Sequence, residues 1–356
     1  MADLQIAINT KKTQMTERLI KLGDVEVTFP SSSLQQIENS EYLYQQGNFY
    51  ELRNKLQEDG FIYLKGVLGR QSVLDARSIV LHGLSQKGDV LKDENESVLL
   101  EACNLGCLPN MEGVNSLTHS PEMINVLEGS SIRKVIGALL DVNPEETKTF
   151  DYKWLRAVGR KTFTGIHCDS VYMSRGSKKL LTCWIPIEES ATLELGALAM
   201  CKGSHKSKGL QHLRDTYGSF DTEAEPGFEG SGWFTNDPLE ITRIDPQVQW
   251  VAGDYEAGDV LIFSLQTLHC STANLTDRVR ISCDIRYQPA NEVIDDRYMG
   301  TAEEMKEKAA QRKKGGAYSA TLDSAGGKEK SLVTIEDLKS RWGFKHINEV
   351  ERLSGL

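Results

Sequence analysis

The sequence predicts a mainly β protein, a sandwich or a jelly roll, with a helical segment before and after the β core. Short β-rich runs bounded by Gly, Asp and Pro begin after residue 145. They cover 149–158, 180–187, 197–201, 260–263 and 278–287. Several short strands separated by turn signals favour packed antiparallel sheets over a sheet in which strands and helices alternate.

Helical patterns precede the β region. Apolar residues recur at helical spacing over 34–59, where Gly60 ends the pattern, and again over 67–84 and 120–140. A short apolar strand is expected at 61–64, between the first two helical stretches. These patterns predict a helical flank that packs on the β core.

The same patterns suggest a domain organisation. We expect a polar, loosely held tail over 1–33 and one domain over 34–294, composed of a helical flank (34–145) and the β core (146–294). Residues 295–356 return to helix-forming composition, with a capping box that starts at Thr334. They are expected to form a helical C-terminal extension of the same domain.

Composition argues against nucleic acid and a membrane as partners. The formal net charge is −10, whereas binding to a phosphate backbone needs clustered Lys and Arg. No apolar run approaches the roughly 20 residues of a membrane helix, and the first residues lack the apolar core of a secretory signal. The seven cysteines have no regular spacing, so we expect them to be reduced and mostly buried. We therefore expect a cytoplasmic monomer or homodimer.

A His-x-Asp motif is the first candidate for chemistry. His167 and Asp169 are two residues apart, and on a strand residues i and i+2 project from the same face. One imidazole and one carboxylate are two thirds of the 2-His-1-carboxylate facial triad, which leaves metal positions open for a cosubstrate and oxygen. Alone the motif is weak, because such short matches arise by chance.

A second cluster supplies a third ligand and a cation. His269 follows a buried strand, and Arg280 lies eleven residues further along, on the next strand. Period-2 alternation places four polar residues on one face of that strand: Arg280, Ser282, Asp284 and Arg286. A charged side chain turned into a β core needs a charged ligand, and a guanidinium suits the distal carboxylate of a dicarboxylate. Ser271 could donate a hydrogen bond to the same group.

Together these motifs resemble the phytanoyl-CoA dioxygenase family of iron and 2-oxoglutarate-dependent oxygenases, over roughly residues 45–290. The resemblance is carried by 58–68, His167-Cys168-Asp169, Trp184-Ile185-Pro186-Ile187, Gly196-Ala197-Leu198, Gly203-Ser204-His205-Lys206, the strand that begins at Gly258-Asp259, and His269, Ser271, Asn274 and Arg280. Their order and spacing are specific, although no single piece is diagnostic. Cys168 and Lys202 depart from the family pattern, which often has Gln and Pro at these positions.

The resemblance implies a double-stranded β-helix (jelly-roll, cupin-like) core and an Fe(II)/2-oxoglutarate-dependent dioxygenase. By matching position, the expected iron ligands are His167, Asp169 and His269. Arg280 and Ser271 are the expected anchors of 2-oxoglutarate, with Trp184 lining that site and Arg156 as a further candidate.

The implied cofactors are Fe(II), 2-oxoglutarate and O2. The implied reaction oxidises a C–H bond of a small-molecule metabolite, with release of succinate and CO2. Asp169 fills the coordination position that a halide occupies in halogenating relatives. The resemblance therefore favours hydroxylation, desaturation or ring formation.

Several arginines have alternative roles. Arg280 can instead form an ion pair with Asp284, and Arg278 is the competing cosubstrate anchor on the same strand face. Arg286 can meet substrate or pair with Asp284, and the pair is favoured. Arg156 can face the site or be purely structural.

Other residues also carry two interpretations. Trp184 is equally well a core aromatic, and His205 is interpreted as a turn residue rather than a ligand. Tyr172 and Arg175 follow the metal motif in a turn, where a substrate would approach.

Residues 209–251 form an insertion before the metal-bearing strand, either a lid or a surface loop that covers a sheet edge. They hold eight Gly or Pro positions and the adjacent aromatics Trp233 and Phe234. Long insertions in compact domains often act as lids, so this segment is expected to order over the substrate and to contribute both aromatics.

Two other classes of protein fit part of the pattern. A cupin-like metal-binding or sensing protein would keep the metal but need neither Arg280 nor Ser271. A zinc hydrolase with the same ligands would want a nearby Glu as general base and has no use for a buried Arg. Succinate release from 2-oxoglutarate separates these hypotheses.

Overall fold

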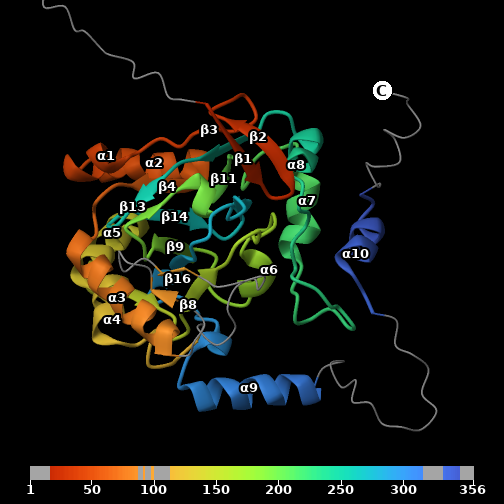
Figure 1. Cartoon of the computed structure of the whole chain (residues 1–356). Coiled ribbons are helices and arrows are strands. Elements are labelled where there is room, and N and C mark those ends of the chain that lie inside the picture. The colour runs from red at the N-terminus through yellow and green to blue at the C-terminus, as the bar shows by residue number, and fades with distance from the viewer. Residues whose placement is uncertain (1–16, 87–90, 93–97, 100–112, 316–331, 345–356) are drawn as a thin grey trace, which may run out of the picture.

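Two facing β-sheets form the centre of the computed structural model, which describes residues 17–86, 91–92, 98–99, 113–315 and 332–344 (Figure 1). The larger sheet has the order β4-β14-β9-β16-β7, and β8 pairs with β16 beside β7. Its strands are β4 (Phe61–Leu64), β7 (Thr147–Thr149), β8 (Trp154–Val158), β9 (Leu181–Pro186), β14 (Val260–Ser264) and β16 (Arg280–Pro289). The expected jelly-roll core with helical flanks is confirmed.

The smaller sheet has the order β15-β11-β12-β3. Its strands are β3 (Gln35–Gln36), β11 (Leu198–Lys202), β12 (Gln249–Ala252) and β15 (His269–Ser271). Three separate two-stranded ladders pair β1 (Arg18–Leu22) with β2 (Val25–Phe29), β5 (Leu91–Lys92) with β6 (Val98–Leu99), and β10 (Ser190–Ala191) with β13 (Tyr255–Glu256).

Alternation along the strands divides the apolar residues between two cores. On β4, Phe61 and Tyr63 pack between the sheets, whereas Ile62 and Leu64 pack under the helices. On β16 the outward set is Ile281, Cys283 and Ile285. The polar set of β16 therefore faces the space between the sheets, as the period-2 pattern predicted.

Helices of the N-terminal half cover the outer face of the larger sheet, at the left in Figure 1. They are α1 (Glu41–Gln45), α2 (Phe49–Asp59), α3 (Arg70–Gln86), α4 (Pro121–Glu128) and α5 (Ser130–Leu140). Gly60 ends α2 in the left-handed region, at φ 86°, as the sequence predicted. Gly129 divides the predicted 120–140 helix into α4 and α5.

The remaining helical elements lie in the second half of the chain. They are α6 (Ser170–Met173), α7 (Gln211–Asp215), α8 (Pro238–Ile244), α9 (Ala302–Gly315) and α10 (Ile335–Arg341), with short 3-10 turns η1 (Pro144–Glu146), η2 (Leu193–Leu195), η3 (Tyr217–Ser219) and η4 (Asp296–Tyr298). The predicted capping box at Thr334 is confirmed at the start of α10.

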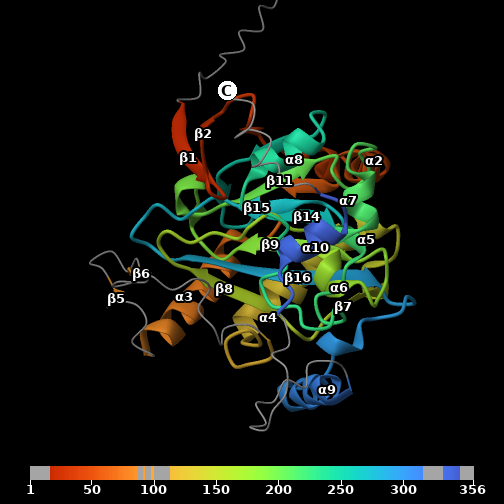
Figure 2. The same cartoon turned by 90° about the vertical axis from the view of Figure 1, so that its right-hand side faces the viewer.

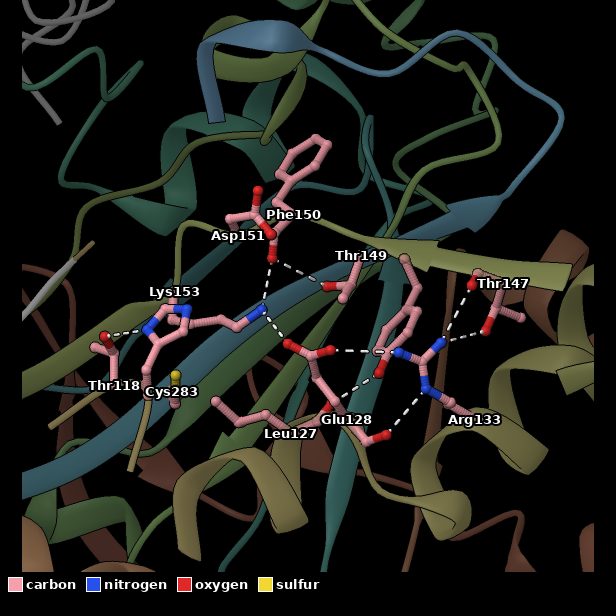
Figure 3. A network of polar contacts seen from close by, with 12 residues as sticks. Thr118, Leu127, Glu128, Arg133, Thr147, Thr149, Phe150, Asp151, Lys153 and Cys283 are labelled. Atoms are coloured by element: carbon pink, nitrogen blue, oxygen red, sulfur yellow. Dashed lines mark hydrogen bonds and ion pairs between the residues drawn. The ribbon is translucent and has the colours of Figure 1, made fainter. Parts of the chain in front are cut away.

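A buried lysine fastens the helical flank to the strands (Figure 3). Lys153, fully buried just before β8, donates to the Phe150 carbonyl at 2.5 Å and pairs with Glu128 at 2.6 Å. Glu128 ends α4 and also pairs with Arg133 of α5 at 3.3 Å, while Arg133 donates to the Thr147 carbonyl at 3.1 Å. This network fixes β8 and β7 against α4 and α5.

The expectation of a loosely held tail is wrong for residues 18–29. They form the β1–β2 hairpin, whose inward residues are fully or nearly buried: Ile20, Leu22, Val27 and Phe29. The hairpin folds because apolar residues alternate on both sides of the Gly23-Asp24 turn and close over the smaller sheet.

The insertion 209–251 is more ordered than its glycine content suggested. It contains α7, η3, α8 and β12, and Leu210, Tyr217 and Ile241 are fully buried. The C-terminal segment packs on it, on the side that faces the viewer in Figure 2: Trp342 accepts a hydrogen bond from His212 through its carbonyl. Whether this segment moves as a lid stays a prediction.

No helix of the described residues is long and apolar enough to cross a membrane. The cysteines that the structure describes are all free and buried, as expected: Cys168, Cys183, Cys201, Cys270 and Cys283. The other two of the seven cysteines, Cys103 and Cys107, lie outside the described residues.

Candidate metal centre and its cavity

The backbones of His167 and His269 form an antiparallel bridge. Each backbone N–H donates to the other residue's carbonyl, at 3.0 and 2.9 Å, and His269 begins β15. Asp169 departs from the expected strand geometry: it is the N-cap of α6, with φ −66° and ψ −19°. Only isolated bridges pair Ile166 and His167 with neighbouring segments, and the turn into α6 places the Asp169 carboxylate beside both imidazoles.

The three side chains converge on one point between the sheets. Oδ1 of Asp169 lies 3.7 Å from Nε2 of His167 and 3.8 Å from Nε2 of His269. The three candidate ligand atoms lie within 4.8 Å of one another, and all three residues are buried. Two imidazoles and one carboxylate at this spacing can hold a transition-metal ion such as iron and leave coordination positions open.

Backbone carbonyls orient both imidazoles. Nδ1 of His167 lies 2.9 Å from the Gly165 carbonyl, and Nδ1 of His269 lies 3.0 Å from that of Thr267. A proton on each Nδ1 satisfies these carbonyls and leaves the Nε2 lone pairs for a metal. Burial lowers the pKa of both rings, to about 3 for His167, where the neighbouring His269 adds to the effect. Both imidazoles are therefore neutral and able to bind metal.

The second oxygen of Asp169 is held by two donors. The Thr182 hydroxyl and Nη2 of Arg286 both donate to Oδ2, the latter at 3.0 Å. Burial would raise the pKa of Asp169, but Arg286 and the two imidazoles outweigh it and keep this pKa well below its usual range. Oδ1 is thereby left as the ligand atom.

Arg286 has a different partner from the one favoured in the sequence. Its closest ion pair is with Asp169, and Asp284 lies further away, at 3.9 Å. Its guanidinium also stacks on Trp154, 3.9 Å from the ring centroid. Arg286 therefore positions the carboxylate of the candidate ligand Asp169.

A cavity of about 450 Å³ opens beside the three ligands. It is lined by Trp154, Arg156, Phe163, Thr164, His167, Asp169, Tyr172, Met173, Trp184, Leu198, Ser231, Trp233, Phe263, His269, Arg280, Asp284, Arg286 and Tyr298. Nine of the twelve site residues proposed from the sequence are in this set. The volume is typical of a small-molecule site.

Arg280 lies deep in the cavity wall and Arg278 does not line it. Arg280 is 2% exposed, donates to the Ser282 hydroxyl, and lies over the ring of Trp184 at 5.8 Å. The Arg278 side chain is 39% exposed and approaches Glu188 at 3.8 Å. Of the two competing anchors, Arg280 is therefore the one that can reach a ligand in the cavity.

Three predicted site residues lie elsewhere. Phe234 is fully buried on the far side of its chain segment, against Tyr217 and Phe344, because adjacent residues of an extended segment point in opposite directions. Arg175 pairs with Asp221 at 2.6 Å, away from the cavity.

Ser271 is the third of these residues. It is fully buried and does not line the cavity, and its Oγ accepts a hydrogen bond from the N–H of the lining residue Thr164 at 2.8 Å.

Sequence reasoning missed several residues of the site. Trp154 could have been found, because it lies two residues before Arg156 and so on the same face of β8. Thr182, which bonds Asp169, carries no local signal, since its role depends on a contact between distant segments. The other unforeseen wall residues include Phe163, Met173, Phe263 and Tyr298.

One family model matches the part of the chain that contains the site. The family model described as "Phytanoyl-CoA dioxygenase (PhyH)" matches residues 134–282, a segment that contains all three candidate ligands and Arg280. The chain is 26% identical over 241 residues to 1-deoxypentalenic acid 11-beta-hydroxylase from Streptomyces exfoliatus, covering 66% of this chain and 79% of the relative. The protein of the same name from Streptomyces arenae is 26% identical over 242 residues, with the same coverage.

Solved structures give more distant similarities. The epimerase SnoN from nogalamycin biosynthesis, described as non-heme and alpha-ketoglutarate dependent, superimposes with a TM-score of 0.47 at 16% identity, over 81% of this chain and 94% of that one. EctD from S. alaskensis, solved with 2-oxoglutarate and 5-hydroxyectoine, gives 0.48 at 13% identity, over 80% and 87%.

The matched segment contains the three residues of the candidate metal centre. The resemblance drawn from the motifs is thereby confirmed. Residues 134–282 match the phytanoyl-CoA dioxygenase family model, and two hydroxylases are similar to the chain over 66% of its length.

Proposed function

We propose that this protein is an Fe(II)/2-oxoglutarate-dependent dioxygenase that hydroxylates a C–H bond of a small-molecule metabolite, with release of succinate and CO2. The observation that carries the proposal is the convergence of two imidazole Nε2 atoms and one carboxylate Oδ1 in a buried position beside a cavity. The donor set fits iron, because nitrogen and oxygen ligands are both present and the metal keeps open positions.

The proposed iron ligands are His167, Asp169 and His269. Bound iron and 2-oxoglutarate supply the oxidising power: 2-oxoglutarate loses CO2 as O2 is consumed, one oxygen atom ends in succinate, and the other goes to the substrate. A carboxylate ligand at Asp169 occupies the place that a halide would need, which supports hydroxylation over halogenation.

Arg280 is the proposed anchor for the distal carboxylate of 2-oxoglutarate. A guanidinium presents parallel N–H donors that match a carboxylate, and a buried one holds it in a low dielectric. The guanidinium of Arg280 lies over the ring of Trp184. Ser271 stays the second proposed anchor, since its hydroxyl has a proton to donate besides the hydrogen bond that its oxygen accepts.

Other residues of the chain keep the ligands in place and the site dry. Arg286 and Thr182 hold the outer oxygen of Asp169, so that its other oxygen has one orientation. Outer contacts of this kind tune metal affinity in other metalloproteins. The aromatic wall around the ligands limits access of water to the reacting centre.

For substrate contact we propose Tyr172 and Trp233, and we no longer propose Arg175 or Phe234. Within the insertion 209–251, the part that meets the cavity is Ser231 with Trp233, and the Tyr172 hydroxyl donates to the Ser231 carbonyl. We propose that this part is the lid. Cleavage near Gly230 by a protease should slow when iron, 2-oxoglutarate and substrate are all present; an unchanged rate would contradict the lid.

The rest of the assignment also stands as proposal. A net charge of −10 supports a protein without a nucleic-acid partner, and we propose a cytoplasmic monomer or homodimer. We further propose one oxygenase domain over 34–294, to which the hairpin 18–29 is joined, and a helical extension over 295–356.

Succinate release tests the proposed function. The protein is incubated with Fe(II), 2-oxoglutarate and O2, with and without candidate substrates, of which 1-deoxypentalenic acid is the first, because the two matching hydroxylases are named for it. Succinate that depends on iron is the expected result. A protein that binds iron but never releases succinate would instead be a metal-binding or sensing protein.

A further inference from the structure

The part of the insertion that meets the cavity lies in a short loop. Ser231 and Trp233 line the cavity, and the glycines on either side of Ser231 have φ angles of 147° and 80°. Such backbone conformations favour glycine, and they give the loop its two bends. The ring of Trp233 lies close against the metal motif, because a Cβ on Gly165 would be 2.6 Å from it. The position of this ring therefore depends on how the two ends of the loop are held.

The α10 segment, residues 332–344, holds the first end of the loop. Phe228 and Val333 form a parallel bridge, and both are buried. The N–H of Val333 donates to the Gly227 carbonyl at 2.8 Å, and the N–H of Glu229 donates to the Val333 carbonyl at 3.0 Å. The backbone just before the loop is thus hydrogen-bonded to the C-terminal part of the chain.

The same segment holds the second end of the loop through Phe234. Nζ of Lys339 lies 4.7 Å from the centroid of the Phe234 ring and 2.9 Å from Oε1 of Glu240 in α8. The ring of Phe344 packs against that of Phe234 at 5.2 Å. The Lys339 side chain is only 10% exposed, so water weakens its cation–π contact little. With Phe234 fixed away from the cavity, the adjacent Trp233 is the residue that faces it.

Phe234 also joins the loop to the metal motif. Its N–H donates to the Ile166 carbonyl, and the Ile166 N–H donates to the Thr235 carbonyl, both at 2.8 Å. Ile166 directly precedes the candidate ligand His167. None of the described residues 332–344 lines the cavity itself. The α10 segment therefore contacts the residues behind the wall.

We propose that the α10 segment positions the cavity wall at Trp233, and that Lys339 is its main positioning residue. The inference goes beyond the proposed function, because it gives the C-terminal extension a role and requires no particular reaction. Loss of the Lys339 charge releases the Phe234 ring, so the loop that ends at Trp233 opens more often. The larger sheet stays closed, since its strands are paired independently of this segment.

Hydrogen exchange of backbone amides measures how often the loop opens. The full-length chain is compared with Lys339→Met, which keeps an apolar stem and removes the charge, and with Lys339→Arg, which keeps the charge. Glu240→Gln is a milder second variant that removes only the carboxylate beside the ammonium, and it decides the test if Lys339→Met does not fold. The control is Lys308→Met, because Lys308 of α9 also pairs with a carboxylate at 2.9 Å, that of Asp296.

The reporter amides are those of Glu229 and Phe234, and the amides of β9 are the reference. Lys339→Met should speed exchange at both reporters by about 5- to 30-fold, the ratio expected when a shielded cation–π contact and a partly exposed ion pair are lost. Exchange in β9 should not change. Glu240→Gln should have a smaller effect in the same direction, Lys339→Arg should restore most of the protection, and Lys308→Met should leave both reporters as in wild type.

Acrylamide quenching of tryptophan fluorescence reports on the wall itself. The signal of Trp233 is the difference between each protein and the same protein carrying Trp233→Phe, which subtracts the other tryptophans. Quenching of Trp233 should rise in Lys339→Met and stay at the wild-type level in Lys308→Met.

Three results would overturn the inference. One is unchanged exchange at the reporter amides in Lys339→Met or, where that variant does not fold, in Glu240→Gln. Another is faster exchange by the same factor at the reporters and in β9, because Lys339 would then add only to global stability. The third is faster exchange at the reporters without a change in the quenching of Trp233. These measurements need neither iron nor 2-oxoglutarate, so they decide the inference even if the protein releases no succinate and the proposed function fails.

Discussion

Replacement of Arg280 by alanine should weaken 2-oxoglutarate binding far more than any change at Arg278. Arg280 is 2% exposed and lies over Trp184, so its charge is held in a region shielded from water. Truncating one member of a buried, hydrogen-bonded charge pair costs on the order of 2–5 kcal/mol. At about 1.4 kcal/mol for each factor of ten, the KM for 2-oxoglutarate should rise roughly 30-fold to several thousand-fold.

The assay is succinate formation as a function of 2-oxoglutarate concentration, at saturating iron and O2. Arg280→Lys keeps the charge but loses the planar fork of donors, so its KM should lie between those of wild type and Arg280→Ala. Arg278→Ala is the matched control, because Arg278 lies two residues before Arg280, where β16 begins, and its side chain is 39% exposed beside Glu188. A large rise in KM for Arg278→Ala with none for Arg280→Ala would refute the assignment.

Three further predictions follow from the contacts of the site and the flank. Arg286→Met removes a donor from Oδ2 of Asp169 and should weaken iron binding by about 10- to 100-fold, measured by anaerobic titration; unchanged iron affinity would mean that the pair is merely structural. The pKa of His167 is lowered to about 3, so this ring is neutral at higher pH. Iron affinity should therefore stay level between about pH 7 and 5.5. A fall in iron affinity centred near pH 6.5, the ordinary histidine pKa, would contradict the burial of His167. Glu128→Gln leaves the ammonium of fully buried Lys153 without its carboxylate partner. Denaturant titration should show a free energy of unfolding lower by about 1–3 kcal/mol, less than for a fully buried pair because the Glu128 side chain is 24% exposed. An unchanged free energy of unfolding would show that the network adds no stability.

The core of the site was predictable because its residues follow short-range rules. The alternation of β16 fixes Arg280 and Arg286 on one face, and the structure places both in the cavity wall. The His-x-Asp spacing also predicted correctly that His167 and Asp169 lie together, although Asp169 belongs to the start of a helix rather than to a strand. Family spacing then selected His269 from the other histidines.

Other features depend on contacts that local patterns do not contain. Arg286 meets Asp169 across 117 positions of sequence, and the sequence favoured its nearer neighbour Asp284 instead. Trp233 and Phe234 were both predicted to contact substrate. Side chains alternate along an extended segment, so only one of two adjacent aromatics can face the cavity. The hairpin 18–29 did carry a signal, since its apolar residues alternate around a Gly-Asp turn, but the polar composition of the N-terminal region outweighed it.

The central claim is that His167, Asp169 and His269 bind one iron that drives 2-oxoglutarate turnover. The most direct test measures bound Fe(II) per chain and succinate release in wild type, His167→Ala and His269→Ala, with His212→Ala as a control at an exposed histidine. We expect one iron per chain in wild type and in the control, and loss of both iron and succinate in the other two variants. Stoichiometric iron with full succinate release in either His167→Ala or His269→Ala would contradict the account.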